Sequence, residues 1–167
     1  MRLPFDVNDT GAREAFLCHE LVATLAGLTE ASAARWGGMT PQQMVEHLLW
    51  AFECSTGRVR VQCPTSAAEL ERSKRFLYHN RPTPHDFMNP ALAAGLPPLR
   101  FASLDTARSA LGAEIGRFVD HVNDRSEALH THPIFGPIGV EEWARTHYKH
   151  GHHHLLQFGL LEAPEGP

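Results

Sequence analysis

Histidine is the residue whose number and spacing could do chemistry in this sequence. The chain contains twelve histidines, and five of them lie between His147 and His154. If this segment is helical, His150 and His154 lie one turn apart on the same face, because an α-helix has about 3.6 residues per turn. Two imidazoles at this spacing can bind one metal ion. The pair is therefore the first candidate for a metal site.

The stripe that holds this pair is expected to face the interior of the protein. It continues through Trp143, His147, Gln157 and Leu161. The large apolar members of this stripe need burial, and polar groups beside them cost free energy unless they have partners. A metal gives several imidazoles one common partner, and the alternative is a set of hydrogen-bonded core histidines. His152 falls on the opposite face and is expected to contact solvent.

A third ligand must come from another helix, and His47 is the best candidate. It shares one helical face with Met44 and Ala51, so we expect it to point into the core. Glu46 is about 100° away around the helix, and we expect it at a solvated edge rather than on the metal. Three neutral imidazoles suit zinc or nickel, with iron(II) and copper as alternatives. Three protein ligands leave one coordination position open, which is typical of catalytic sites.

Four other residues are candidates for roles around the metal. A bound ion lowers the pKa of a coordinated water or thiol, and His147 is the best internal option for a Brønsted base. The alternative for His147 is a core or surface histidine with ordinary hydrogen bonds. Gln157 is expected to orient a ligand imidazole. Gln43 either caps its helix alone or also reaches the mouth of the site, and Trp143 could line or seal the pocket.

The helix that carries His47 has the clearest boundaries. Thr40 is a suitable N-cap, Pro41 suits the first helical position, and Gln43 completes a capping box. The sequence therefore predicts a helix from Pro41 to about Ser55. Gly57 is expected to end it.

The remaining elements are predicted from hydrophobic periodicity and from chain breakers. Apolar residues recur at three- and four-residue spacing in two more long stretches, 12–28 and 103–123. A third long stretch, 140–158, carries the histidine pair. The segment 79–98 is dense in proline and cannot form a regular helix, so we expect it to fold as a loop over one end of the protein. No convincing strand is found. The expected helices are 12–28, 41–55, 66–78, 103–123 and 140–158.

These elements predict an all-α fold. Four long amphipathic helices indicate a four-helix bundle, with a long Pro-rich crossover between the second and third long helices. The chain has 167 residues, which suits one domain over residues 1–167.

Composition excludes several classes of protein. The net charge is −4 and no stripe of Lys and Arg is present, which argues against nucleic-acid binding. No apolar run is long enough to cross a membrane, and the first residues lack the apolar stretch of a secretory signal. The three cysteines Cys18, Cys54 and Cys63 form no metal-binding pair. A cytoplasmic protein is the simplest expectation.

Two blocks of the sequence resemble signatures of a known family. Residues 132–159, His-Pro-Ile-Phe-Gly-Pro-Ile-Gly-Val-Glu-Glu-Trp-Ala-Arg-Thr-His-Tyr-Lys-His-Gly-His-His-His-Leu-Leu-Gln-Phe-Gly, resemble the C-terminal signature of a DinB/YfiT-like subfamily of unknown function. Residues 36–47, Trp-Gly-Gly-Met-Thr-Pro-Gln-Gln-Met-Val-Glu-His, resemble its N-terminal signature. With the Pro-rich middle, the resemblance covers most of the chain.

The resemblance implies a four-helix bundle with a long crossover. It also implies a metal-binding triad of one histidine from the second helix and two, four residues apart, from the last, which are His47, His150 and His154. Members of the family often form homodimers, and some relatives transfer small thiols while others are regarded as metal-dependent hydrolases. Many relatives have Arg-Gly-Gln after the paired histidines, whereas this chain has Leu155-Leu156-Gln157 and keeps only the glutamine.

Three functions remain open on the sequence. The leading hypothesis is a metal-dependent enzyme, a thiol transferase or a hydrolase, that acts on a small-molecule substrate such as a thiol. The second is a non-catalytic metal-binding or ligand-sensing module, with a closed site sealed by an aromatic side chain. The third is a helical interaction domain whose histidines bind no metal.

Overall fold

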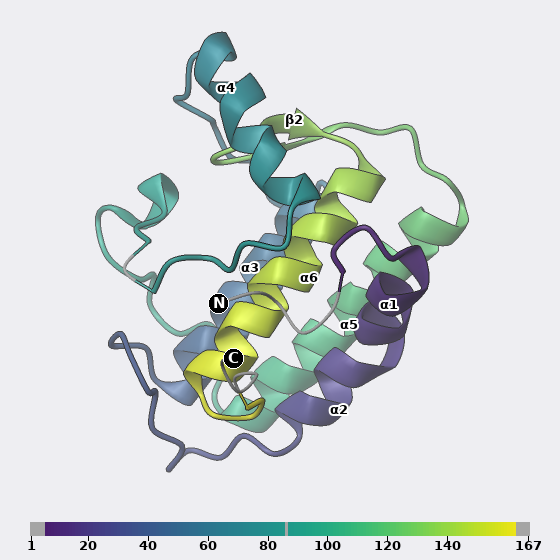
Figure 1. Cartoon of the computed structure of the whole chain (residues 1–167). Coiled ribbons are helices and arrows are strands. Elements are labelled where there is room, and N and C mark those ends of the chain that lie inside the picture. Colours follow the sequence, from purple (N-terminus) through teal and green to yellow (C-terminus); the bar gives the residue numbers. More distant parts are fainter. Residues whose placement is uncertain (1–5, 86, 163–167) are drawn as a thin grey trace, which may run out of the picture.

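The computed structural model describes residues 6–85 and 87–162, and most of them are helical (Figure 1). The three longest helices are α3 (Pro41–Ser55), α5 (Leu104–Asn123) and α6 (Val140–Gln157). Near the N-terminus, α1 (Thr10–Ala15), a π-helical turn (Phe16–Glu20) and α2 (Leu21–Leu25) follow one another without a gap. The shorter elements are α4 (Ala67–Lys74) and two 3₁₀ turns (Arg75–Tyr78 and Pro90–Leu92).

Helix α3 begins and ends where the sequence predicts. The hydroxyl of Thr40 accepts a hydrogen bond from the Gln43 backbone N–H at 3.2 Å, and Oε1 of Gln43 accepts one from the Thr40 N–H at 2.9 Å. Gly57 follows the helix with a φ of 75°, a conformation that favours glycine. The capping box and the stop signal are thus confirmed.

Two expectations about secondary structure are wrong in detail. The first helical segment covers residues 10–25 rather than 12–28, and it contains a π-helical turn that hydrophobic spacing does not reveal. A short antiparallel hairpin also forms between β1 (His130–His132) and β2 (Gly136–Ile138). Its strands are too short to produce a readable alternation of apolar and polar residues.

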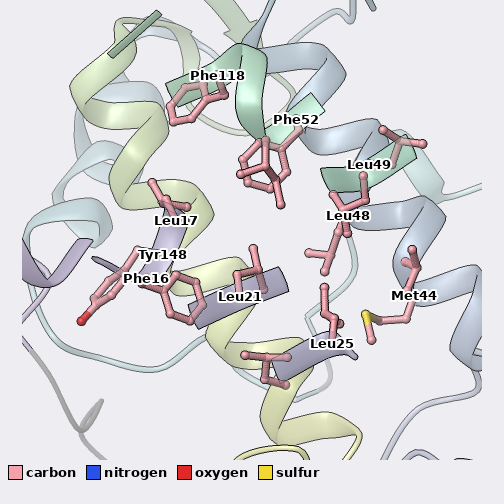
Figure 2. Close-up of a cluster of buried hydrophobic side chains, with 14 of the residues drawn as sticks. Phe16, Leu17, Leu21, Leu25, Met44, Leu48, Leu49, Phe52, Phe118 and Tyr148 are labelled. Carbon is pink, nitrogen blue, oxygen red and sulfur yellow. The ribbon is translucent and has the colours of Figure 1, made fainter. Parts of the chain in front are cut away.

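One hydrophobic core holds the helices together (Figure 2). The N-terminal segment contributes Phe16, Leu17, Leu21 and Leu25, and α3 contributes Met44, Leu48, Leu49 and Phe52. Phe118 comes from α5 and Tyr148 from α6. Helix α3 contacts both α5 and α6. Side chains on the side of α3 that faces α6 can therefore contact side chains of α6.

Gly151 permits the close contact between α6 and the N-terminal segment. A Cβ atom at this position would lie 3.0 Å from Cε1 of Phe16 and 3.3 Å from Cδ1 of Leu21. We expect Gly151→Ala to destabilise the fold by about 1–2 kcal/mol in chemical denaturation, since overpacking outweighs the better helix propensity of alanine. At Gly112 in α5, by contrast, a Cβ atom would meet nothing beyond its own helix backbone within 4 Å. Gly112→Ala is the matched control and should stabilise the protein by about 0.5–1 kcal/mol; equal effects of the two substitutions would contradict this explanation.

Among the described residues, no helix combines the length and hydrophobicity that a transmembrane span requires.

Candidate metal centre

The structure brings His47 of α3 together with His150 and His154 of α6. Nε2 of His150 lies 2.8 Å from Nε2 of His47 and 3.0 Å from Nε2 of His154. One potential ligand atom from each residue lies within 4.8 Å of the other two. His154 is buried, whereas His47 and His150 are partly exposed. Three ring nitrogens therefore converge at one point in the fold.

The hydrogen bonds of His154 direct a nitrogen lone pair toward this point. The amide nitrogen of Gln157 donates to the carbonyl oxygen of Trp36 at 2.9 Å, which leaves Oε1 of Gln157 facing Nδ1 of His154 at 2.7 Å. Since the amide oxygen can only accept, Nδ1 of His154 is the donor. Nε2 of the neutral ring then carries a lone pair that faces His150.

A metal ion fits this donor set. Zinc binds imidazole nitrogens at about 2.0–2.1 Å, so tetrahedral ligands lie about 3.3 Å apart. The spacings of 2.8 and 3.0 Å on either side of His150 would have to widen by a few tenths of an ångström, and the third spacing, between His47 and His154, lies within 4.8 Å. A shared ion would also give the facing nitrogens of His47, His150 and His154 one common partner.

Electrostatics favours the neutral form of all three rings. Burial lowers the pKa of His47 to about 4. The pKa values of His150 and His154 lie well below the ordinary value, first because of burial and then because of the neighbouring histidines. Neutral imidazole is the form that binds metals, so protons do not compete for the site near neutral pH.

Gln157 lies outside the triad and fixes the orientation of His154. We expect Gln157→Leu to weaken metal binding about 10–100-fold, because the variant loses the acceptor that holds the His154 ring. Competition against a chromophoric chelator measures the affinity. Gln62→Leu, on an exposed connector, should leave the affinity unchanged, and an unchanged affinity in the Gln157 variant would show that this hydrogen bond does not matter.

His147 and Trp143 lie deeper in the core than the triad. Nε2 of His147 is 2.8 Å from Oγ of Ser55, and its ring stacks on Phe52 with 3.7 Å between centroids. Nε1 of Trp143 donates to the carbonyl oxygen of His130 at 3.1 Å, and its ring stacks near His147. Both side chains pack the core, and neither lines the cleft beside His47 that is described below.

Glu46 was expected at a solvated edge of α3, but this residue is buried, with only 8% of its surface exposed. Its carboxylate accepts hydrogen bonds from the backbone N–H groups of Arg100 at 2.7 Å and Phe101 at 3.2 Å. Nε2 of Gln42 donates a third at 3.0 Å. The backbone just after the Pro-rich segment 79–98 is thus tied to α3 one residue before His47.

A cleft of about 320 Å³ opens between α3 and this segment. From α3 it is lined by Gln43, Glu46, His47 and Trp50, and from the other side by residues between Ala91 and Arg100. Gln43 therefore contributes to the cleft as well as to the capping box. His47 is the triad residue that lines this cleft.

His152 is fully buried, contrary to the expectation that it contacts solvent. Helix α6 contacts α3, the N-terminal helical segment and the 3₁₀ turn Arg75–Tyr78, and His152 lines a small cavity together with Trp36, Pro82 and Thr83. The neighbouring Lys149 donates from Nζ to the carbonyl oxygens of Phe76 at 2.9 Å, His79 at 2.6 Å and Arg81 at 2.8 Å. The segment after α4 thereby lies against the face of α6 that periodicity assigned to solvent.

The local geometry is what defines this centre. Comparisons of the chain with protein-family models, with curated proteins and with solved structures give no match.

Proposed function

We propose that this protein is a metal-dependent enzyme that binds one divalent transition metal ion through His47, His150 and His154. The observation that carries the proposal is the convergence of three ring nitrogens beside a cleft. Zinc or nickel is the proposed ion, with iron(II) or copper as alternatives, since neutral imidazole is a ligand for all four. The proposed architecture is a four-helix bundle of the DinB/YfiT type.

Three protein ligands leave a coordination position for a substrate or a water molecule. A divalent ion in such a site lowers the pKa of a coordinated thiol or water and stabilises developing negative charge. This supports two reaction classes, thiol transfer and hydrolysis. In both, Gln157 holds the His154 ring in place, and the walls of the cleft restrict how a substrate approaches His47.

Metal analysis followed by activity screening tests the proposal. We expect about one equivalent of metal per chain in untagged protein by elemental analysis, as one three-histidine site requires. Metal-loaded protein should then transform a member of a panel of thiol acceptors or hydrolysable esters and amides. Absence of bound metal at any loading would overturn the proposal. Full metal content without turnover of any substrate would instead indicate a non-catalytic metal-binding or sensing module.

A sealed site would favour that non-catalytic alternative. Trp50 is the aromatic residue closest to this role, because its ring centroid lies 6.2 Å from that of His47. Trp50 nevertheless lines the cleft together with His47, and both side chains are partly exposed. An accessible cleft supports the enzyme over the closed module.

A further inference from the structure

The cleft beside His47 combines apolar walls with a cation. Its large apolar side chains are Trp50 of α3 and, across from it, Leu92, Leu96 and Leu99. Arg100 lines the same space. The volume of about 320 Å³ lies at the small end of the range for pockets that bind small molecules, about 300–1,000 Å³. The space therefore suits one small molecule with a largely apolar body.

The guanidinium group of Arg100 has hydrogen-bond donors to spare. Nη1 and Nη2 each donate one hydrogen bond to the carboxylate of Glu53, at 2.7 and 2.8 Å. A guanidinium group carries five N–H donors, so three of those of Arg100 have no acceptor among the residues that the structure describes. The Arg100 side chain is 47% exposed, so an anion can approach it. Arg100 can therefore bind a second carboxylate without releasing Glu53.

The acidic side chains near the cleft are less available to a ligand. Both oxygens of Glu46 accept backbone N–H groups, and one also accepts from Gln42. The Glu53 side chain is only 6% exposed and is held by Arg100. An ammonium group on a ligand would have to displace one of these partners, and burying a charge without a partner is costly. The cleft therefore favours an anionic head group over a cationic one.

We infer that the cleft binds a small carboxylic acid as its anion. The carboxylate pairs with Arg100, and the apolar body lies between Trp50 and the leucines, on the side toward His47. As a statement about the substrate the inference rests on the proposed function, because only then is the bound molecule a substrate. It adds the class that the proposed function leaves open, an aryl or alkyl monocarboxylate rather than a neutral or cationic molecule.

Calorimetry with metal-free protein tests the choice of head group. Phenylbutyrate, phenylbutanol and phenylbutylamine share one apolar body and differ only in the group that would meet Arg100. We expect the acid to bind about tenfold more tightly than the alcohol, because a charge-assisted pair adds to the same apolar contacts. The amine should bind most weakly. Equal affinities for the acid and the alcohol, or a preference for the amine, would overturn the inference.

Arg100→Gln tests the residue that carries the charge. It should lower the affinity for phenylbutyrate about tenfold and leave the affinity for phenylbutanol unchanged. Arg117→Gln is the matched control, because Arg117 is 50% exposed, pairs with the buried Glu114 at 2.8 Å and lies outside the cleft. The control should bind phenylbutyrate like the wild type. An unchanged affinity for phenylbutyrate in Arg100→Gln would contradict the inference.

Glu53→Gln separates a role in binding from a role in stability. Arg100→Gln leaves the Glu53 carboxylate buried without its ion pair, and a loss of fold would mimic a loss of binding. Glu53→Gln instead keeps an oxygen acceptor and removes the charge that opposes a second anion, so it should bind phenylbutyrate about threefold more tightly. The double variant Glu53→Gln, Arg100→Gln should bind the acid and the alcohol alike. Weaker binding in Glu53→Gln, or a double variant that still prefers the acid, would overturn the inference.

These titrations keep the inference separate from the proposed function, because none of them requires a metal ion. Failure of the protein to bind zinc would overturn only the proposed function and would leave the carboxylate site in place. Stoichiometric metal without a preference for the acid would overturn only the inference.

Discussion

The His150→Ala variant is expected to fold normally and to lose stoichiometric metal. Nε2 of His150 lies between the nitrogens of His47 and His154, so its removal leaves two ligands without the one that joins them. We expect the affinity for zinc to fall by more than about a hundredfold, roughly 3 kcal/mol, which is about one ligand's share of a typical site. Elemental analysis and chelator competition measure the loss.

Thermal unfolding gives an independent test of the same variant. Metal at about a thousandfold excess over the wild-type Kd should stabilise the wild type by about 4 kcal/mol and the variant, whose affinity is at least about a hundredfold lower, by no more than about 1.4 kcal/mol. Without metal the two proteins should be similarly stable, because alanine is a good helix former. His153→Ala is the matched control, since this histidine neighbours the triad without belonging to it. Equal metal content in His150→Ala and the wild type would refute the triad.

Acid is expected to destabilise the metal-free protein steeply below about pH 6.5. His132 and His147 are held as neutral rings in the native state. Nδ1 of His132 accepts the backbone N–H groups of Ile134 at 3.0 Å and Phe135 at 3.3 Å, so it cannot carry a proton. Burial lowers the pKa of His132 to about 3, and it places the pKa of His147 well below the ordinary value.

The direction of this effect follows from proton binding. Both pKa values are lower in the folded than in the unfolded state, so the unfolded chain binds more protons as pH falls from 6.5 toward 3. Each ring then removes about 1.4 kcal/mol of unfolding free energy per pH unit. Together these two rings remove about 5 kcal/mol by two units below 6.5, which is as much as many domains possess.

Urea denaturation at pH 7.0, 5.5 and 4.5 measures this slope. His132→Asn keeps an acceptor for the two backbone N–H groups and does not titrate. The free energy of unfolding of this variant should therefore fall less steeply than that of the wild type, and the two slopes should differ by about 1.4 kcal/mol per pH unit. A wild-type stability that is independent of pH between 7.0 and 4.5 would contradict the assignment of neutral buried rings.

Local signals were sufficient to predict the three longest helices, α3, α5 and α6, and the meeting of His47 with His150 and His154. The capping box around Thr40 fixes the start of α3 because its hydrogen bonds involve residues three positions apart. His150 and His154 were predictable as a pair because helical geometry alone places them on one face. Gln157 was found by the same reasoning, since it continues the stripe of His150 and His154.

The contacts of the Pro-rich segment could not be predicted in this way. Glu46 looks like an edge residue from its angle on α3, and only the return of Arg100 and Phe101 to that helix buries it. His152 is likewise buried by a chain segment far away in sequence. A helix periodicity identifies one apolar face, but it does not say whether other segments cover the remaining faces.

The order of residues on α3 couples two parts of the molecule. His47 is a proposed ligand, and the adjacent Glu46 holds the backbone of Arg100 and Phe101. A movement of α3 that increases the distances between the ring nitrogens would therefore also displace Arg100 and Phe101, which follow the cleft-lining residues 91–99. We therefore expect that binding of an ion at the three histidines would also change the width of the cleft, so that metal-loaded and metal-free protein would differ in their affinity for the same small molecule.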